Sequence, residues 1–214
     1  MIKLLLVDDH ELVRTGIRRI LEDVQDFQVV GEATTGEEAV KFCRKNNPDL
    51  VLMDMSMPGI GGIEATKQIL RFTESTRIIV LSVHKENPIP AKVMQMGAFG
   101  YLTKDSEPGE MIRAIRKVAA GQKYVSPDIA QQIALGQLDF KDGNPFEALS
   151  ERELEITLMV TKGAKVPDIA AYLNISSKTV NTYRYRMFDK LSVSSDVELT
   201  HLALRHKLIN SDQL

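Results

Sequence analysis

The stretch Leu50-Val51-Leu52-Met53-Asp54-Met55-Ser56-Met57-Pro58-Gly59 places a single carboxylate at the end of a continuous apolar run. The length of the run and its lack of alternation are typical of a strand buried on both faces of a parallel sheet. The Pro-Gly pair that follows predicts a turn. Because open α/β sheets bind their ligands beyond the carboxyl ends of the strands, we expect Asp54 at the functional edge of a sheet.

Strand-like and helix-like patterns alternate on both sides of this stretch over the first 120 residues. Short apolar runs predict strands, and apolar residues recurring every three or four positions predict amphipathic helices. The expected strands span 2–7, 27–32, 50–53, 77–82 and 99–102, and the expected helices span 11–24, 36–45, 62–72, 91–96 and 107–119. Five βα units predict an α/β domain with a doubly wound, five-stranded parallel sheet of the flavodoxin-like type.

The pattern changes after Gly121, the expected end of this first domain (1–121). Residues 122–147 contain several turn signals, among them Asp142-Gly143-Asn144-Pro145, around one helix-like segment at 128–138. We therefore expect a linker with a short helix at 122–147.

The remaining residues, 148–214, predict an all-α domain, because no strand pattern occurs there. Four helices are expected, at 151–161, 166–173, 177–191 and 197–206. Only Asn174-Ile175-Ser176 separates the second of these helices from the third, and so tight a connection indicates a helix-turn-helix.

Composition excludes several classes of protein. The chain has 214 residues, of which 43% are apolar and 26% charged, as in ordinary globular domains. No apolar stretch approaches the roughly 20 residues that span a bilayer, so no membrane association is expected. The single cysteine, Cys43, excludes an intramolecular disulfide and fits a cytoplasmic location. A net charge of −2 predicts no general affinity for nucleic acids, so any DNA-binding surface must be local.

A pair of carboxylates, Asp8 and Asp9, ends the first apolar run. If the strands at 2–7 and 50–53 are neighbours, these two side chains converge with Asp54 on one edge of the sheet. Such a cluster is costly unless a cation or a proton neutralises it. Three hard oxygen ligands suit Mg²⁺ better than zinc or copper. His10 is a weaker candidate ligand, because Mg²⁺ prefers oxygen and a surface or capping imidazole is commoner.

Four ordered motifs, spread over nearly the whole chain, match a known pattern. They are Val7-Asp8-Asp9-His10 with Arg14-Thr15-Gly16, Met53-Asp54-Met55-Ser56-Met57-Pro58-Gly59, Gly97-Ala98-Phe99-Gly100-Tyr101-Leu102-Thr103-Lys104 and Leu149-Ser150-Glu151-Arg152-Glu153. Residues 1–120 resemble a response-regulator receiver domain, and 148–210 resemble a LuxR-type helix-turn-helix. The chain is thus similar to the NarL/FixJ family of two-component transcription factors, and within it most resembles the GacA/UvrY group of global regulators.

The resemblance implies a role for each acidic residue. Asp54 would be the phosphoacceptor, a carboxylate nucleophile that takes phosphate from a sensor histidine kinase or its phosphotransfer domain. The Mg²⁺ ligands would be Asp8, Asp9, Asp54 and the backbone carbonyl of Ser56. The metal would offset the negative charge of the phosphoryl group.

The resemblance also implies roles for three residues on later strands. Lys104 would pair with one phosphoryl oxygen, and the Ser82 hydroxyl would swing to bond another. Tyr101 would then turn inward into the space that Ser82 vacates, so Ser82 and Tyr101 would form the switch.

Each of these residues also has an ordinary structural interpretation. Asp8 or Asp9 alone is suited to capping the helix that follows, and Asp54 to capping a turn. Lys104 alone reads as a solvated loop lysine, and Tyr101 as a half-buried strand aromatic. Their convergence favours the functional interpretation, because several perturbed groups rarely meet at one site by accident.

The helix expected at 177–191 carries the local signal for DNA binding. Basic residues outnumber acidic ones four to one between Ser176 and Lys190. Residues expected to face base edges in a major groove are Lys178, Asn181, Thr182 and Tyr185. Residues expected to contact phosphates are Ser177, Thr179, Arg184 and Arg186, and Lys190 completes the basic set. The alternative is a helix face that is merely solvated.

A homodimer is expected on activation, since one recognition helix makes too few contacts for specificity. Val197, Leu199 and Leu202 give the last helix more apolar surface than a small bundle needs, so they are candidates for the dimer face. The alternative is that these side chains pack against the preceding helices.

We therefore expect a DNA-binding transcriptional response regulator that is not an enzyme. Phosphorylation would release the DNA-binding domain from the receiver through the linker and permit dimerisation on promoter DNA. The resemblance implies small regulatory RNA genes as targets, and RNA polymerase is a further candidate partner. One alternative is a Mg²⁺-dependent aspartyl-phosphate phosphatase, although Ser56 stands where such enzymes carry a second aspartate. The other is a protein-interaction module that binds no DNA.

Overall fold

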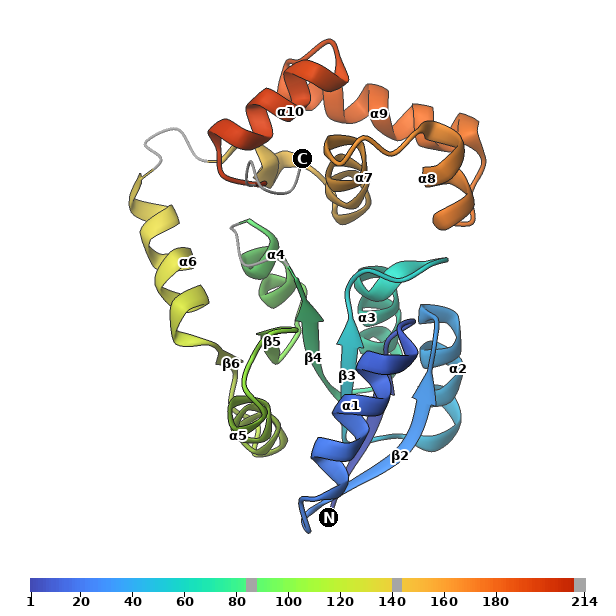
Figure 1. Cartoon of the computed structure of the whole chain (residues 1–214), viewed down its shortest axis with the longest axis vertical. Helices are drawn as coiled ribbons and strands as arrows, with labels where there is room; N and C mark the ends of the chain where they lie inside the picture. The colour runs from blue at the N-terminus through green and yellow to red at the C-terminus, as the bar shows by residue number, and fades with distance from the viewer. Residues whose placement is uncertain (84–87, 140–143, 210–214) are drawn as a thin grey trace. The chain divides into compact units, whose positions relative to one another are not determined.

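The chain divides into two compact units (Figure 1). The computed structural model describes residues 1–83, 88–139 and 144–209. The first unit carries the sheet and ends at Pro127, and the second begins at Asp128, with residues 88–92 grouped with it. Within the described ranges, every helix is too short or too polar to cross a bilayer.

The first unit is built on a parallel sheet with the strand order β2-β1-β3-β4-β5-β6. The strands are β1 Ile2–Val7, β2 Phe27–Ala33, β3 Leu50–Asp54, β4 Arg77–Ser82, β5 Gly100–Thr103 and β6 Tyr124–Val125. The helices are α1 Glu11–Glu22, α2 Gly36–Asn46, α3 Gly61–Phe72, α4 Ile89–Gln95 and α5 Pro108–Ala119. The strand order reverses direction next to β1, between β1 and β3, which is where such sheets bind ligands.

The sheet has six strands, so the prediction of five strands was wrong by one short edge strand. Tyr124 and Val125 pair with Gly100 and Tyr101, and the Tyr124 amide donates to the Phe99 carbonyl at 2.8 Å. Gly121 adopts a φ of +85° after α5, a conformation that glycine adopts without steric cost, and the chain turns back along β5. Two residues are too few to show a strand period. Part of the segment predicted as a linker therefore belongs to the sheet.

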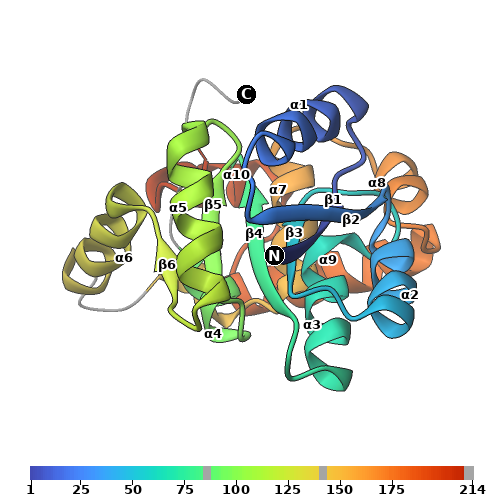
Figure 2. The ribbon, with the colours of Figure 1, turned by 90° about the horizontal axis from the view of Figure 1, so that it is seen from below.

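Helices cover both faces of this sheet (Figure 2). In that view α1 and α5 lie on one side, and α2 and α3 lie on the other. Successive strand residues point to opposite faces, so both faces of a central strand must be apolar, as in Leu50–Met53. Cys43 is buried on α2, where it packs as a small apolar side chain, and burial raises the pKa of its thiol to about 12.

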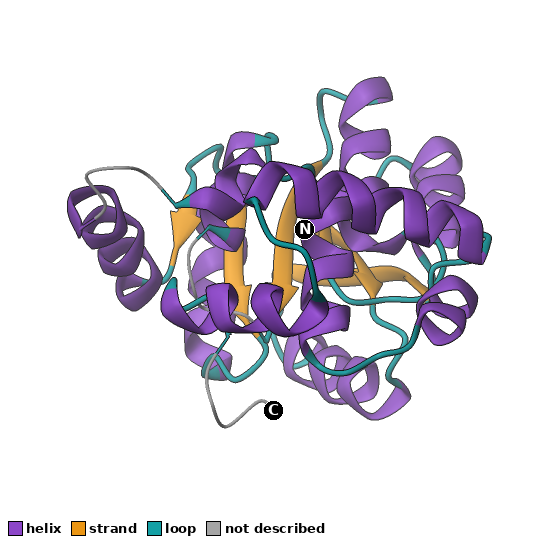
Figure 3. Ribbon diagram, turned by 90° about the horizontal axis from the view of Figure 1, so that it is seen from above, coloured by secondary structure: helices purple, strands orange, loops and turns teal. Residues whose placement is uncertain are grey.

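In the residues that the structure describes, the second unit is helical and the strands lie in one sheet in the first unit (Figure 3). Its elements are α6 Pro127–Asp139, the 3-10 helix η1 Pro145–Ala148, α7 Glu151–Thr161, α8 Val166–Tyr172, α9 Ser177–Leu191 and α10 Asp196–Arg205. Serine hydroxyls cap the amino ends of three helices: Ser150 for α7, Ser176 for α9 and Ser195 for α10. Asn174 has a φ of 51° and makes the tight turn between α8 and α9, which confirms the helix-turn-helix.

Candidate functional site

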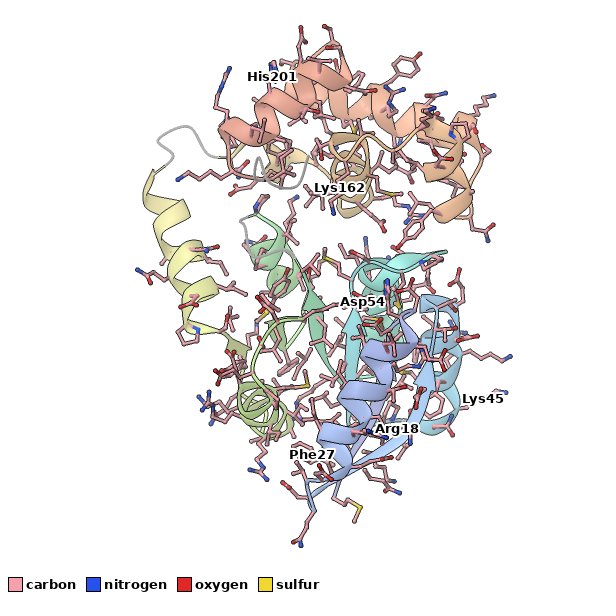
Figure 4. All side chains as sticks on the ribbon, viewed as in Figure 1. Arg18, Phe27, Lys45, Asp54, Lys162 and His201 are labelled. Atoms are coloured by element: carbon pink, nitrogen blue, oxygen red, sulfur yellow. The ribbon has the colours of Figure 1, made fainter. Side chains whose placement is uncertain are left out.

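The predicted pocket residues meet at the carboxyl edge of the sheet. Asp54 is the last residue of β3, where Figure 4 labels it, and Asp8 directly follows β1. The pairing of Val7 with Met53 and of Asp54 with Leu81 aligns the ends of β1, β3 and β4. Lys104 follows the last residue of β5. The parallel register therefore brings together groups that lie up to 96 positions apart in the sequence.

Lys104 forms an ion pair with two of the three acidic residues. Its Nζ lies 2.8 Å from Asp8 Oδ2 and 2.8 Å from Asp54 Oδ2. Asp8 and Asp54 are each only 1% exposed, whereas the Lys104 side chain is 17% exposed. The lysine therefore reaches a buried acidic pocket from the rim, where it could also meet an oxyanion bound at Asp54.

Burial and neighbouring charges shift the pKa values in this pocket. Burial raises the pKa of the Asp54 carboxyl to about 6, the nearby Asp8 adds to the rise, and the contacts with Lys104 oppose it. The pKa of Lys104 is raised, because its bonds to Asp54 and Asp8 outweigh the effect of burial, which alone would lower it. Ionisation of the buried Asp54 carboxyl is costly, and a bound cation would reduce that cost. The pocket is therefore suited to binding a cation that neutralises the carboxylates.

The same pocket fits a divalent cation. One ligand atom each from Asp8, Asp9, His10 and Asp54 lies within 4.8 Å of the others. Three carboxylates and one lysine leave a net charge of about −2 if all are ionised, which a divalent ion would balance. Three carboxylate oxygens of the pocket are buried, namely Asp8 Oδ2, Asp9 Oδ1 and Asp54 Oδ2. Among the described residues, their polar contacts are with Lys104 or His10 only. Hard oxygen donors of this kind suit Mg²⁺.

His10 is bound to the acidic pair rather than pointing away from it. Its backbone amide donates to Asp8 Oδ1 at 2.8 Å, and its Nδ1 lies 2.9 Å from Asp9 Oδ1. The Asp8 side chain thus bonds the residue just before α1, while its other oxygen faces Lys104; the N-cap of α1 is His10 without a side-chain cap, so neither aspartate caps this helix. One aspartate therefore holds the turn before α1 and lines the pocket at once.

The residues assigned to the switch are buried beside the pocket. The Ser82 hydroxyl contacts Met55 Sδ at 3.9 Å, and the Ser82 carbonyl accepts from the Lys104 amide at 2.9 Å. Tyr101 is 0% exposed, so its ring already points inward in this structure. Ser56 donates its amide to Asp54 Oδ1 at 3.2 Å, which places its backbone at the pocket.

Two residues at the site were not identified from the sequence. Gly62 lies so close to the end of β3 that a Cβ there would be 1.8 Å from the Asp54 carbonyl oxygen. Arg14 donates from Nη1 to the Asp8 carbonyl oxygen at 2.8 Å. Arg14 stood in a recognised motif, but nothing in the pattern indicated its partner.

A second candidate site is the outer face of α9. Val180, Met187 and Leu191 form the inward face of this helix and are buried against the rest of the unit. The predicted base-reading set includes the exposed residues Lys178, Thr182 and Tyr185, with Tyr185 75% exposed, and the half-buried Asn181.

Two basic residues of the predicted DNA-binding set are already held within the unit. Arg184 pairs with Asp196 at the start of α10. Lys190 Nζ lies 2.7 Å from Glu153 Oε2, an oxygen that also accepts from the Ser150 amide in the capping box of α7. These bonds to Glu153 lower its pKa, although burial alone would raise it. Both cations therefore fix α9 in place, whatever else they contact.

The predicted dimer face is smaller than expected. Leu199 is 0% exposed and packs in the core of the unit, so it is not available to a partner. Val197 is 65% exposed and Leu202 is half-buried. The proposed face is therefore reduced to Val197 and Leu202, and the packing alternative is correct for Leu199.

Comparison with known proteins gives matches over both units. The family model described as "Response regulator receiver domain" matches residues 4–116, and that described as "Bacterial regulatory proteins, luxR family" matches residues 147–203. The response regulator UvrY of Escherichia coli (strain K12) is 63% identical over 100% of this chain and 99% of UvrY. The response regulator GacA of Pseudomonas aeruginosa is 52% identical over 99% of each chain. A solved structure of two RcsB dimers bound to two parallel DNAs matches with a TM-score of 0.60 and 28% identity, over 94% of this chain and 96% of RcsB.

Proposed function

The chain belongs to the response regulators that join a receiver domain to a LuxR-family DNA-binding domain, and from that premise we propose that phosphorylation of Asp54 controls how it binds promoter DNA. As a member of this family, it is a DNA-binding transcriptional regulator of a two-component system. The observation that carries the proposal is the convergence of Asp8, Asp54 and Lys104 in one buried pocket at the carboxyl edge of the sheet.

The proposed reaction is a transfer of one phosphoryl group to Asp54. A carboxylate oxygen attacks phosphorus, the new oxygen–phosphorus bond forms, and the bond to a histidine nitrogen of the donor kinase breaks. Lys104 leaves its ion pairs with the aspartates to contact a phosphoryl oxygen, and the Ser56 amide holds the Asp54 side chain in position. Asp8, Asp9, Asp54 and the Ser56 carbonyl would hold Mg²⁺, which when bound offsets the charge on the phosphoryl oxygens.

The phosphoryl group then biases a switch beside the pocket. Ser82 would exchange its Met55 contact for a phosphoryl oxygen, and the packing around Tyr101 would change with it. The result we propose is release of the DNA-binding domain and dimerisation through Val197 and Leu202. Two dimers of RcsB bind DNA in a solved structure, and we infer a dimeric DNA-bound form for this chain as well.

The proposed targets and location follow from the same premise. We infer a cytoplasmic location, because the DNA that the regulator binds lies there. From the family resemblance of the sequence we propose promoters of small regulatory RNA genes as targets, with RNA polymerase as a further partner. We propose that the chain is not an enzyme, since a serine at position 56 cannot act as the general acid that protonates a leaving group.

The test is DNA binding with and without acetyl phosphate and Mg²⁺, for wild type and Asp54→Ala side by side. Tighter binding to promoter DNA upon phosphorylation in wild type alone would support both the acceptor and the coupling. Equal binding in all four samples would refute the coupling and leave only the DNA-binding function. A turnover assay on small phosphate esters should show no release of phosphate beyond slow loss from Asp54 itself.

A further inference from the structure

Arg14 links the acidic pocket to the outer part of the sheet. It lies on α1, and its side chain is 13% exposed. Nη1 donates to the Asp8 carbonyl oxygen at 2.8 Å, and Nε donates to Glu32 Oε2 at 2.6 Å. One guanidinium therefore bonds the backbone at the end of β1 and a carboxylate on β2, a geometry that its planar fork permits.

Glu32 is itself held in place, so Arg14 is anchored at its far end. The second carboxylate oxygen of Glu32 accepts from Arg18 Nε, and Arg18 Nη1 bonds Glu22 at 2.8 Å. Burial alone would raise the pKa of Glu32, but the bonds from Arg14 and Arg18 outweigh it and lower that pKa. Glu32 is therefore a charged, fixed acceptor, and only Arg14 of the two arginines reaches the pocket.

The position of the Asp8 backbone decides where both acidic side chains point. The Asp8 amide donates to the Ala33 carbonyl at 3.2 Å, so β2 holds the peptide group before Asp8, whereas Arg14 holds the peptide group after it. Asp9 follows directly and is 24% exposed in its side chain, at the point where the chain leaves the sheet. Without Arg14 the Asp8 carbonyl would lose this donor, and the Asp8–Asp9 peptide would be held only by the contacts of the two side chains with His10 and Lys104.

We propose that Arg14 is a positioning residue for the divalent cation of the receiver pocket, acting through the Asp8 carbonyl and never touching the ion. The inference rests on the proposed function, because it concerns the metal that phosphorylation of Asp54 requires. Residues that orient metal ligands from outside the coordination sphere typically contribute about 10- to 100-fold to metal affinity. Arg14 is suited to that role because its guanidinium stays charged and cannot itself ligate a metal.

The experiment measures cation binding by the full chain in the absence of any phosphate donor. Mn²⁺ is the probe, since it takes the same oxygen ligands as Mg²⁺ and the free ion is counted by electron paramagnetic resonance; competition with Mg²⁺ then gives the Mg²⁺ affinity. We expect Arg14→Ala to raise the Kd about tenfold. Arg14→Lys, which keeps a donor for one of the two acceptors, should give an intermediate Kd.

Arg18→Ala is the matched control, because Arg18 bonds the same Glu32 but no pocket atom. Its Kd should stay within about twofold of wild type. Thermal unfolding in EDTA reports on folding for every variant, and Arg14→Gln replaces Arg14→Ala if the latter does not fold. A Kd for Arg14→Ala within about twofold of wild type, or an equal loss in Arg18→Ala, would overturn the inference. No binding by wild type would refute the metal site itself and with it the proposed phosphorylation of Asp54.

Discussion

Replacing Asp54 by asparagine should stabilise the metal-free protein at neutral pH. The carboxyl is 1% exposed, and burial raises its pKa from 3.8 to about 6. At 1.36 kcal/mol for each unit of pKa, this difference corresponds to about 3 kcal/mol against the ionised form in the folded state. An asparagine side chain has a neutral amide of the same shape, so Asp54→Asn should remove most of that cost.

The effect should depend on pH in a defined direction. The folded state holds the Asp54 proton more tightly than the unfolded state, so this group favours folding at low pH. That contribution is lost as the pH rises from the unfolded pKa towards the folded value of about 6. The free energy of unfolding of Asp54→Asn should therefore exceed that of wild type by only about 1 kcal/mol at pH 4.5 and by about 3 kcal/mol at pH 7.5.

The assay is urea unfolding of the full chain in EDTA at the two pH values, with the transition of the receiver unit followed separately. Asp23→Asn, at an exposed position at the end of α1, is the control and should change the free energy of unfolding by less than about 0.5 kcal/mol. Saturating Mg²⁺ should reduce the difference in free energy of unfolding between Asp54→Asn and wild type, because it stabilises wild type. An Asp54→Asn protein that is no more stable than wild type at pH 7.5, or a gap equal at both pH values, would refute the reasoning.

Three further predictions concern other parts of the chain. Gly62→Ala should destabilise the receiver unit by about 3 kcal/mol or more, since its Cβ would lie 1.8 Å from the Asp54 carbonyl oxygen. Gly16→Ala should instead stabilise the unit by about 1 kcal/mol, because Gly16 lies on an exposed helix and a Cβ there would have no atom within 4 Å. Thermal unfolding of the two variants makes the comparison. Glu153→Gln should destabilise the helical unit at pH 7. Because folding lowers the pKa of Glu153, the stability difference between the variant and wild type should vanish as the pH falls through that pKa, and unfolding followed by circular dichroism at several pH values would show this. Lys178→Ala should weaken DNA binding, and a loss of affinity confined to particular base sequences would support base readout. A loss that is equal for all sequences, with a slope of log affinity against log salt concentration that is smaller by about one, would instead indicate a phosphate contact.

Much of the fold follows from local patterns. The apolar run at Leu50–Met53 and the amphipathic helices each depend on residues close together in the sequence, and the structure confirms them. The missed strand, Tyr124–Val125, has no period of its own and forms because β5 offers it a paired edge. Local patterns therefore predicted the elements that are long enough to carry a period.

The sequence by itself determined which residue types stand at the ends of the strands, and parallel pairing then allowed the convergence of Asp8, Asp54 and Lys104 to be expected. Only the tertiary structure decided which partner each side chain has. Leu199 and Leu202 belong to the same helix, yet the packing of α10 buries the first fully and the second only in part. The bond between Arg14 and the Asp8 carbonyl joins a side chain to a backbone atom, which no residue pattern specifies. The physical reason is that periodicity defines faces along one element, whereas contacts depend on how several elements meet in space.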